Sequence, residues 1–180
     1  VPGVSVAGMV NRLPLGGIAQ IGTIELERGG RENVTLPSVD WRTATPDYFR
    51  AIGIPLVEGR SFVSTDAETA PLVAIIDERT AQLGWPGQSP IGRRLRIPVP
   101  GSAVAFTFRA GHMPWATVIG VVGHIRHDAL DDDGRPQVYW SHLQRAQDRM
   151  VLVARTIGDP DAMASSIISA VREVDSEQPV

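Results

Sequence analysis

The residues with the clearest potential for chemistry lie near position 125. His124 and His127 flank two residues, and four aspartates follow them: Asp128, Asp131, Asp132 and Asp133. Imidazole nitrogen and carboxylate oxygen are common ligands of zinc and other transition metals. The preceding segment is typical of a β-strand, however, and residues three apart on a strand point to opposite faces. The pattern therefore favours a solvated strand end and an acidic turn over a metal site.

Neither nucleophilic catalysis nor nucleotide binding has a matching motif. The chain lacks the Gly-x-Ser-x-Gly sequence of hydrolases. The serines that we expect in turns or helix caps are Ser61, Ser64, Ser89 and Ser141. Gly120 and Gly123 have the wrong spacing for a dinucleotide-binding fingerprint and predict close backbone packing instead. The Gly84–Gly87 turn lacks the lysine of a phosphate-binding loop, and the chain contains no lysine.

Arg93, Arg94 and Arg96 form the basic cluster of the sequence. On an alternating strand, Arg94 and Arg96 share the outward face. Such charge is typical of an edge strand, because it discourages pairing with another molecule. The alternative is a docking surface for an acidic partner. Trp115 and Trp140 leave a similar choice between a core position and an anchor for a partner.

The composition is that of an ordinary folded domain of 180 residues, with 43% hydrophobic and 21% charged residues. A net charge of −3 gives no field that would gather nucleic acid, so we expect no nucleic-acid partner. The absence of cysteine excludes disulfides and thiolate catalysis. No apolar run approaches the ~20 residues of a membrane helix. Both ends fall beside predicted elements, so we expect an excised piece of a longer protein.

Short strands and helices must position these residues. Strands are predicted over residues 4–10, 23–27 and 34–43, the last with an edge or bend at Pro37. Thr45 and Pro46 predict a helix start, because threonine caps free N–H groups and proline presets φ. Gly53 predicts the end of that helix. The apolar run 72–76 predicts a strand buried on both faces.

The second half of the sequence also predicts short helices and strands. Asp77 predicts a helix cap, and residues 93–97 alternate with Leu95 and Ile97 inward. Residues 98–114 are the least regular region. Residues 115–126 predict a central strand that kinks at Gly120 and Gly123, and 138–140 the next strand.

The C-terminal part predicts a buried strand over residues 150–156 and a following helix. Asp159 is the expected cap, with Pro160 at the first helical position. Apolar residues then share one helical face, which predicts packing on a sheet; they are Met163, Ile167, Val171 and Val174.

Four segments taken in order resemble a known family. They are residues 45–56 (TPDYFRAIGIPL), 85–92 (WPGQSPIG), 118–127 (VIGVVGHIRH) and 158–162 (GDPDA). The sequence resembles the MacB-like periplasmic core domain of ABC-transporter permeases, most closely the permeases described from Acidobacteria. The likeness spans nearly the whole chain and is strongest in the C-terminal half.

The resemblance implies an α+β fold with mixed sheets and short helices. A porter-like α/β subdomain would comprise residues 1–58 together with 149–180, and a β-rich subdomain, residues 59–148, would be inserted in it. The domain would lie between the first and second transmembrane helices of its permease, on the periplasmic face of the cell inner membrane. No catalytic, cofactor-binding or metal-binding residues are implied, and no cofactor.

The implied function is non-enzymatic transmission of ATP-driven motion to substrate or partner proteins, in efflux or in lipoprotein or lipid transport. Its partners would be the flanking transmembrane helices, a cytoplasmic ATPase and a periplasmic adaptor protein. The alternative is a small hydrolase or metal-dependent enzyme using His124, His127 and the nearby aspartates. A third hypothesis is a ligand-binding module with its pocket between the two subdomains.

Overall fold

A mixed β-sheet with short helices organises the chain, as the family resemblance implied. The computed structural model describes residues 1–14, 20–29, 32–98, 114–126 and 134–177. Within these ranges the elements follow the order β1 (Val4–Val10), β2 (Ile21–Leu26), β3 (Val34–Ala44), α1 (Tyr48–Ile52), β4 (Leu56–Gly59), β5 (Val73–Asp77), α2 (Glu78–Gly84), β6 (Arg94–Arg96), β7 (Ala116–Val122), β8 (Gln137–Ser141), β9 (Val151–Thr156) and α3 (Pro160–Val174).

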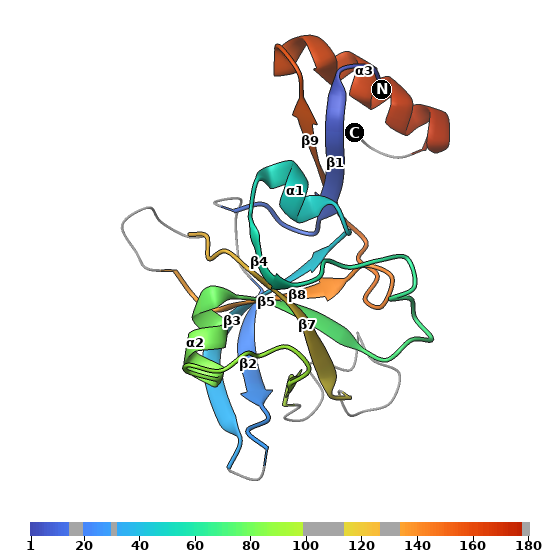
Figure 1. The fold of residues 1–180 in the computed structure, drawn as a ribbon. Coiled ribbons are helices and arrows are strands. Elements are labelled where there is room, and N and C mark those ends of the chain that lie inside the picture. The colour runs from blue at the N-terminus through green and yellow to red at the C-terminus, as the bar shows by residue number, and fades with distance from the viewer. Residues whose placement is uncertain (15–19, 30–31, 99–113, 127–133, 178–180) are drawn as a thin grey trace.

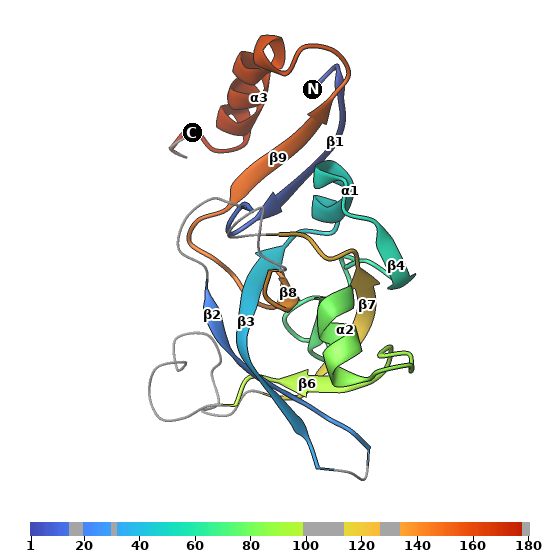
Figure 2. The same cartoon turned by 90° about the vertical axis from the view of Figure 1, so that its left-hand side faces the viewer.

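Most of the strands close into a barrel. The strands β2, β6, β7, β5, β8 and β3 pair in this order, and β3 pairs back with β2 (Figure 2). The β3–β8 and β5–β7 pairs are parallel, and the other pairs of the ring are antiparallel. An apolar cluster holds the ring together: Ile24, Leu26, Leu36, Val39, Ala74, Ile76, Trp85, Leu95, Ile97, Ala116, Val118, Val121, Val138 and Trp140.

A second apolar cluster lies on the other face of β5 and β8, where α1 covers them. Tyr48 and Phe49 of α1 are buried, and the rings of Phe49 and Tyr139 meet edge to face at 4.9 Å between centroids. Ile75 and Val122 complete this contact from β5 and β7. Burial of so much aromatic surface fixes the position of a helix that is too short to be stable alone.

The strands β1 and β9 and the helix α3 form a terminal unit beside the barrel. β1 pairs with β9 along its length, whereas it meets the barrel strand β3 only at Val10 and Ala44. Figures 1 and 2 show the unit standing away from the barrel, with both marked chain ends at its side.

Several local predictions are confirmed. The side chain of Asp77 accepts a hydrogen bond from the Thr80 N–H and caps α2, and Asp159 caps α3 in the same manner from Asp161. Gly53 ends α1 with φ at 89°. The predicted bend near Pro37 is a shift of the β2–β3 register beside Ser38, which has φ at 57°.

Other local predictions are wrong. Thr45 does not cap α1, because its Oγ1 accepts a hydrogen bond from the Met9 N–H at 2.7 Å. β9 is not buried, since it ends the sheet and pairs only with β1 among the described strands. The prediction for α3 holds in part: the helix contacts β9, and Met163, Ile167 and Val171 are half-buried, but no side chain of the helix is fully buried in the described residues and Val174 is 90% exposed. Most of the irregular segment 98–114 lies outside the described residues.

Candidate functional site

His124 follows β7, and its ring contacts a buried carboxylate. Its Nδ1 lies 2.5 Å from Oδ2 of Asp77, whose side chain is fully buried. Oδ1 of Asp77 accepts hydrogen bonds from the backbone N–H groups of Thr80 and Gln137, at 2.9 and 3.0 Å. The Asp77 carboxylate thus joins the start of α2, the start of β8 and His124, the second residue after β7. The contact between His124 and Asp77 therefore has a structural role.

The metal-site hypothesis gains no support from the part of the chain that the structure describes, where no three His, Asp or Glu side chains are placed to hold a metal ion. His127, Asp128 and Asp131–Asp133 lie outside that part. The serines also have structural contacts. Ser61 donates to the Pro46 carbonyl, and Ser141 donates to the carbonyl of residue 66. Neither is positioned as a nucleophile beside a base.

Gly120 supports close backbone packing, as predicted. A Cβ on Gly120 would lie closer than 3.0 Å to the carbonyl oxygen of Arg60, and a Cβ on Gly59 would meet the carbonyl oxygen of Ile119 equally closely. The register of β5 on β7 shifts beside Gly120, which is the predicted kink. The glycines therefore allow β4 to pair with β7 rather than forming a ligand loop.

The edge-strand interpretation of the arginine cluster is wrong, because β6 lies between β2 and β7. Arg94 pairs with Glu27, and Arg96 pairs with Glu25 at 2.7 Å. Both guanidinium groups also lie over the ring of Trp115, 5.6 and 4.5 Å from its centroid. The hydrogen bond from Arg94 lowers the pKa of Glu27. These two arginines are thus neutralised within the barrel wall and leave little charge for an acidic partner.

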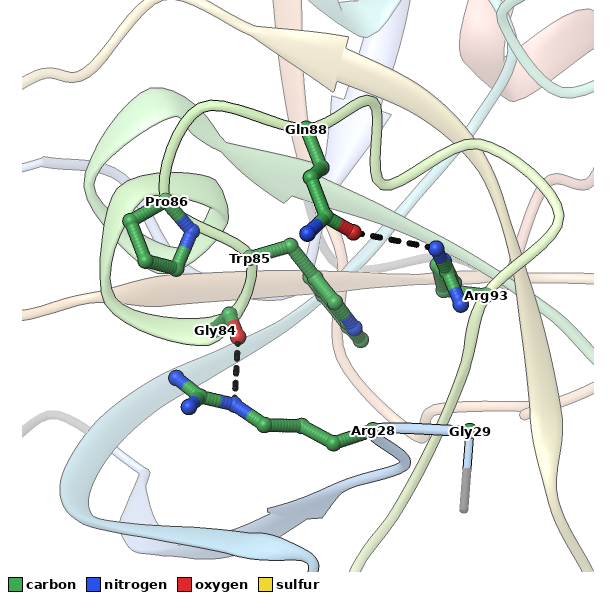
Figure 3. A pocket seen from close by; sticks show the side chains of 7 residues that line it. All are labelled: Arg28, Gly29, Gly84, Trp85, Pro86, Gln88 and Arg93. Atoms are coloured by element: carbon green, nitrogen blue, oxygen red, sulfur yellow. Dashed lines mark hydrogen bonds between the residues drawn. The ribbon is translucent and has the colours of Figure 1, made fainter. Parts of the chain in front are cut away.

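Arg93 instead borders a cavity of about 340 Å³ at the end of α2 (Figure 3). Its lining residues are Arg28, Gly29, Gly84, Trp85, Pro86, Gln88 and Arg93. Trp85 is only 4% exposed, and its Nε1 donates to the carbonyl of Glu27 at 2.9 Å. The indole is therefore a fixed wall of the cavity.

The charged groups of this cavity are both cationic, Arg28 and Arg93. Arg28 donates to the carbonyl oxygens of Gly84 and Leu83, at 3.0 and 3.3 Å, and so satisfies the end of α2. Arg93 donates to Oε1 of Gln88 at 3.1 Å. Within the described residues neither arginine forms a salt bridge, and the charge of Arg93 is only a minor cause of the lowered pKa of Glu27, after the hydrogen bond from Arg94. The cavity therefore has the chemistry of a weak anion site. The sequence did not predict this cavity, because Arg28 is distant in sequence from Trp85 and only the fold brings the two together.

A narrow junction connects the terminal unit to the rest of the molecule through α1 and the turn before it. Gly8 of β1 packs so tightly that a Cβ there would lie closer than 3.0 Å to the backbone of Tyr48. Thr45 bonds to Met9 on the same side, and Nε of Arg155 in β9 donates to the carbonyl of Ala51 at 3.3 Å. A movement of β1 or β9 would therefore displace α1.

Comparison with known proteins identifies this arrangement. The family model of the MacB-like periplasmic core domain matches residues 2–174. The chain belongs to this family. As a MacB-like domain it is the periplasmic core domain of an ABC-transporter permease, and the homologous permease domains are not enzymes.

Solved structures share the fold of this MacB-like domain. The periplasmic region of MacB from Actinobacillus actinomycetemcomitans is 13% identical, with a TM-score of 0.54, over 96% of this chain and 86% of that one. A domain of a putative permease protein from Porphyromonas gingivalis is 17% identical, with a TM-score of 0.56, over 98% and 74%. The extracellular domain of the noncanonic ABC-type transporter YknZ from Gram-positive bacteria is 13% identical, with a TM-score of 0.52, over 99% and 80%.

A search of the curated proteins found no match to this chain. Among the described residues, no helix of this MacB-like domain has the length and apolar character needed to cross a membrane.

Proposed function

We propose that this domain is a mechanical lever of an ABC-transporter permease. ATP hydrolysis on a cytoplasmic ATPase would move transmembrane helices that flank the domain, and the terminal unit would pass that movement to the barrel. The output would be motion of a substrate or a partner protein, in efflux or in lipoprotein or lipid transport. The domain would work at the periplasmic face of the inner membrane, with a periplasmic adaptor protein as a further partner.

The narrow junction between terminal unit and barrel carries this proposal. Two packed bodies that meet over a small area can rock between discrete packings, whereas a continuous core resists deformation. β1 has a single paired position with β3, and further contacts run through α1, through Thr45 before it, and through the hydrogen bonds between Asn11 and Thr43. Both chain ends lie at the terminal unit, which suits input from two flanking helices (Figure 1).

The division into two moving parts is also a proposal. A porter-like part of residues 1–58 with 149–180 and an inserted part of residues 59–148 would move against one another. The pairing of β2 and β3 with β6 and β8 supports a boundary nearer Val10, with these two strands moving with the barrel. The first boundary of the lever would then lie at the end of β1.

Distance measurement between spin labels tests the lever. The chain has no cysteine, so two introduced cysteines are labelled selectively. The pair Ser166→Cys on α3 and Gln82→Cys on α2 reports across the junction. The pair Ser64→Cys and Gln82→Cys is the control, because both residues lie on the barrel side.

The measurement uses the complete permease with its ATPase, nucleotide-free and with ATP bound. We expect the distance distribution of the Ser166–Gln82 pair to differ between the two states and that of the Ser64–Gln82 pair to stay fixed. Equal distributions for the first pair in both states would refute the lever. Turnover of a hydrolase substrate by the isolated chain, lost in a His124→Ala variant, would favour the enzyme alternative.

A further inference from the structure

Arg145, shortly after β8, carries a buried guanidinium group, and no described residue supplies a counter-ion for it. The residue is 6% exposed, and within the described residues its Nε and Nη1 atoms have no hydrogen-bond acceptor. The buried Arg42, in contrast, pairs with Asp40 at 2.7 Å. Burial of a cation without a partner is strongly unfavourable, so native proteins rarely keep one unless something compensates its charge.

Other unsatisfied donors lie on neighbouring strands. Trp41 and Thr43 are two residues apart on β3 and share its inner face, and Thr43 is the register partner of Trp140 on β8. The indole Nε1 atoms of Trp41 and Trp140 and the Thr43 hydroxyl have no partner in the described part of the chain. Cζ of Arg145 lies 5.9 Å from the centroid of the Trp41 ring. We call these four residues the donor cluster.

The contacts that exist do not compensate the charge. A cation–π contact weakens towards ~6 Å, so the Trp41 ring is a poor substitute for a counter-ion. Burial lowers the pKa of the Arg145 guanidinium, and no carboxylate opposes that effect. The Trp41 ring packs against Gly22 of β2 so closely that a Cβ there would clash with it, so its position is fixed.

The unpartnered groups of the donor cluster can all donate hydrogen bonds. Indole and guanidinium nitrogens only donate hydrogen bonds, and a hydroxyl can donate as well. Several buried donors on residues that neighbour a positive charge suit an anion better than water, because each water also brings hydrogens that need acceptors.

We propose that the donor cluster binds a small monovalent anion of the size of chloride at this end of the barrel. The burial of Arg145 and Trp140 limits the ligand to a small ion, since a phosphate ester or a peptide carboxylate would have to open the barrel wall. The bound ion would neutralise Arg145 and tie the segment after β8 to β3. This site is separate from the Trp85 cavity and does not depend on the lever.

Thermal unfolding of the 180-residue chain tests the site. Chloride is raised from zero to 0.2 M in exchange for gluconate at constant ionic strength, so that general screening stays the same. An ion that binds only the folded state raises Tm with its concentration, and we expect a rise of about 5 °C. An equal Tm in chloride and gluconate would overturn the proposal.

Two variants localise the effect. Arg145→Met keeps much of the side-chain volume and removes the charge, so its Tm should no longer respond to chloride. Arg93→Met removes an equal charge from the Trp85 cavity and should respond as the unmodified chain does. A chloride response that survives in Arg145→Met would overturn the assignment to this cluster.

Crystals of the unmodified chain grown in sodium bromide give a result even if Arg145→Met does not fold. Anomalous scattering should place bromide within hydrogen-bond distance of Arg145 and of at least one of the two indole nitrogens. Density for water alone at this position, or bromide only at the molecular surface, would overturn the proposal.

Discussion

The barrel and the terminal unit are built from similar strands but bury their side chains very differently. Ile76, Val118 and Trp140 are fully buried in the barrel. In the terminal unit, Val151 and Leu152 of β9 are 37% and 40% exposed, and Val174 of α3 is 90% exposed. A closed ring of strands covers its own apolar face, whereas a two-stranded sheet with one helix cannot.

This difference predicts two levels of stability within one chain. Regions with few buried apolar contacts open at lower free energy than regions around a full core. The terminal unit should therefore change its packing while the barrel stays intact, which is the property that a lever needs. Mutations that act unequally on the two regions examine this point directly.

The largest contrast should come from the same substitution made in each region. Ile76→Ala empties a fully buried position of the barrel and should lower the free energy of unfolding by about 3 kcal/mol. Ile167→Ala on the half-buried face of α3 should lower it by less than about 1 kcal/mol. Urea unfolding followed by circular dichroism measures both.

Equal losses in these two variants would mean that α3 is as well packed as the barrel and that the two regions do not differ in stability. The unmodified chain is the common reference. A constant slope of the free energy with urea shows that the variants change stability rather than the extent of unfolding.

Much of the local structure could be predicted from the sequence. The apolar run of β5, the Asp77 cap and the glycine at the end of α1 are decided by residues within a few positions of one another. The closed ring could not be predicted, because it depends on pairs such as Glu25 with Arg96, which are distant in sequence. For the same reason β6 resembled an edge strand, and β9 resembled a buried one.

The next prediction concerns the loss of stability at alkaline pH and Tyr48, which lies between the barrel and the terminal unit. Burial raises the pKa of Tyr48 to about 12, and its hydroxyl has no hydrogen-bond partner among the described residues. Because the folded pKa lies above the unfolded value of 10.0, this stability is present below pH 10 and is lost between pH 10 and 12. The loss should reach about 2.5 kcal/mol.

Tyr48→Phe should leave the free energy of unfolding almost unchanged at pH 7, since it removes only an unpaired hydroxyl. Between pH 10 and 12 its stability should fall less steeply than that of the unmodified chain. Urea unfolding at pH 7, 9.5, 10.5 and 11.5 measures the slope. Identical slopes for the two proteins would show that Tyr48 ionises in the folded state as easily as in the unfolded one.

Gly8→Ala should weaken the junction by about 1–2 kcal/mol, because the added Cβ pushes on the backbone of Tyr48. Amide hydrogen exchange should become faster in β1 and β9 and remain unchanged in β5 and β7. The exposed neighbour Ala7 provides a matched control, and Ala7→Ser should change stability by less than about 0.5 kcal/mol. Uniformly faster exchange would indicate one cooperative unit rather than two.

The candidate sites were harder to predict than the fold. The Trp85 cavity joins Arg28 to residues of the α2–β6 connection, and the donor cluster joins Arg145 to β3. In both cases the decisive feature is an arginine that forms no salt bridge with a carboxylate of the described residues. That feature depends on which arginines the fold pairs with acids, and the sequence shows only that both kinds of residue are present.

The smallest effects should come from exposed ion pairs, and they test whether charge pairing stabilises the barrel more than the junction at α1. The Asp47–Arg50 pair lies on and just before α1, and the Glu27–Arg94 pair lies on the barrel wall. Asp47→Asn and Glu27→Gln should each cost less than about 0.5 kcal/mol, because both pairs are open to water. The costs should shrink further in 0.5 M salt. If Glu27→Gln cost several times more than Asp47→Asn, charge pairing would stabilise the barrel more than the junction; equal small costs would mean that exposed ion pairs do not favour the barrel.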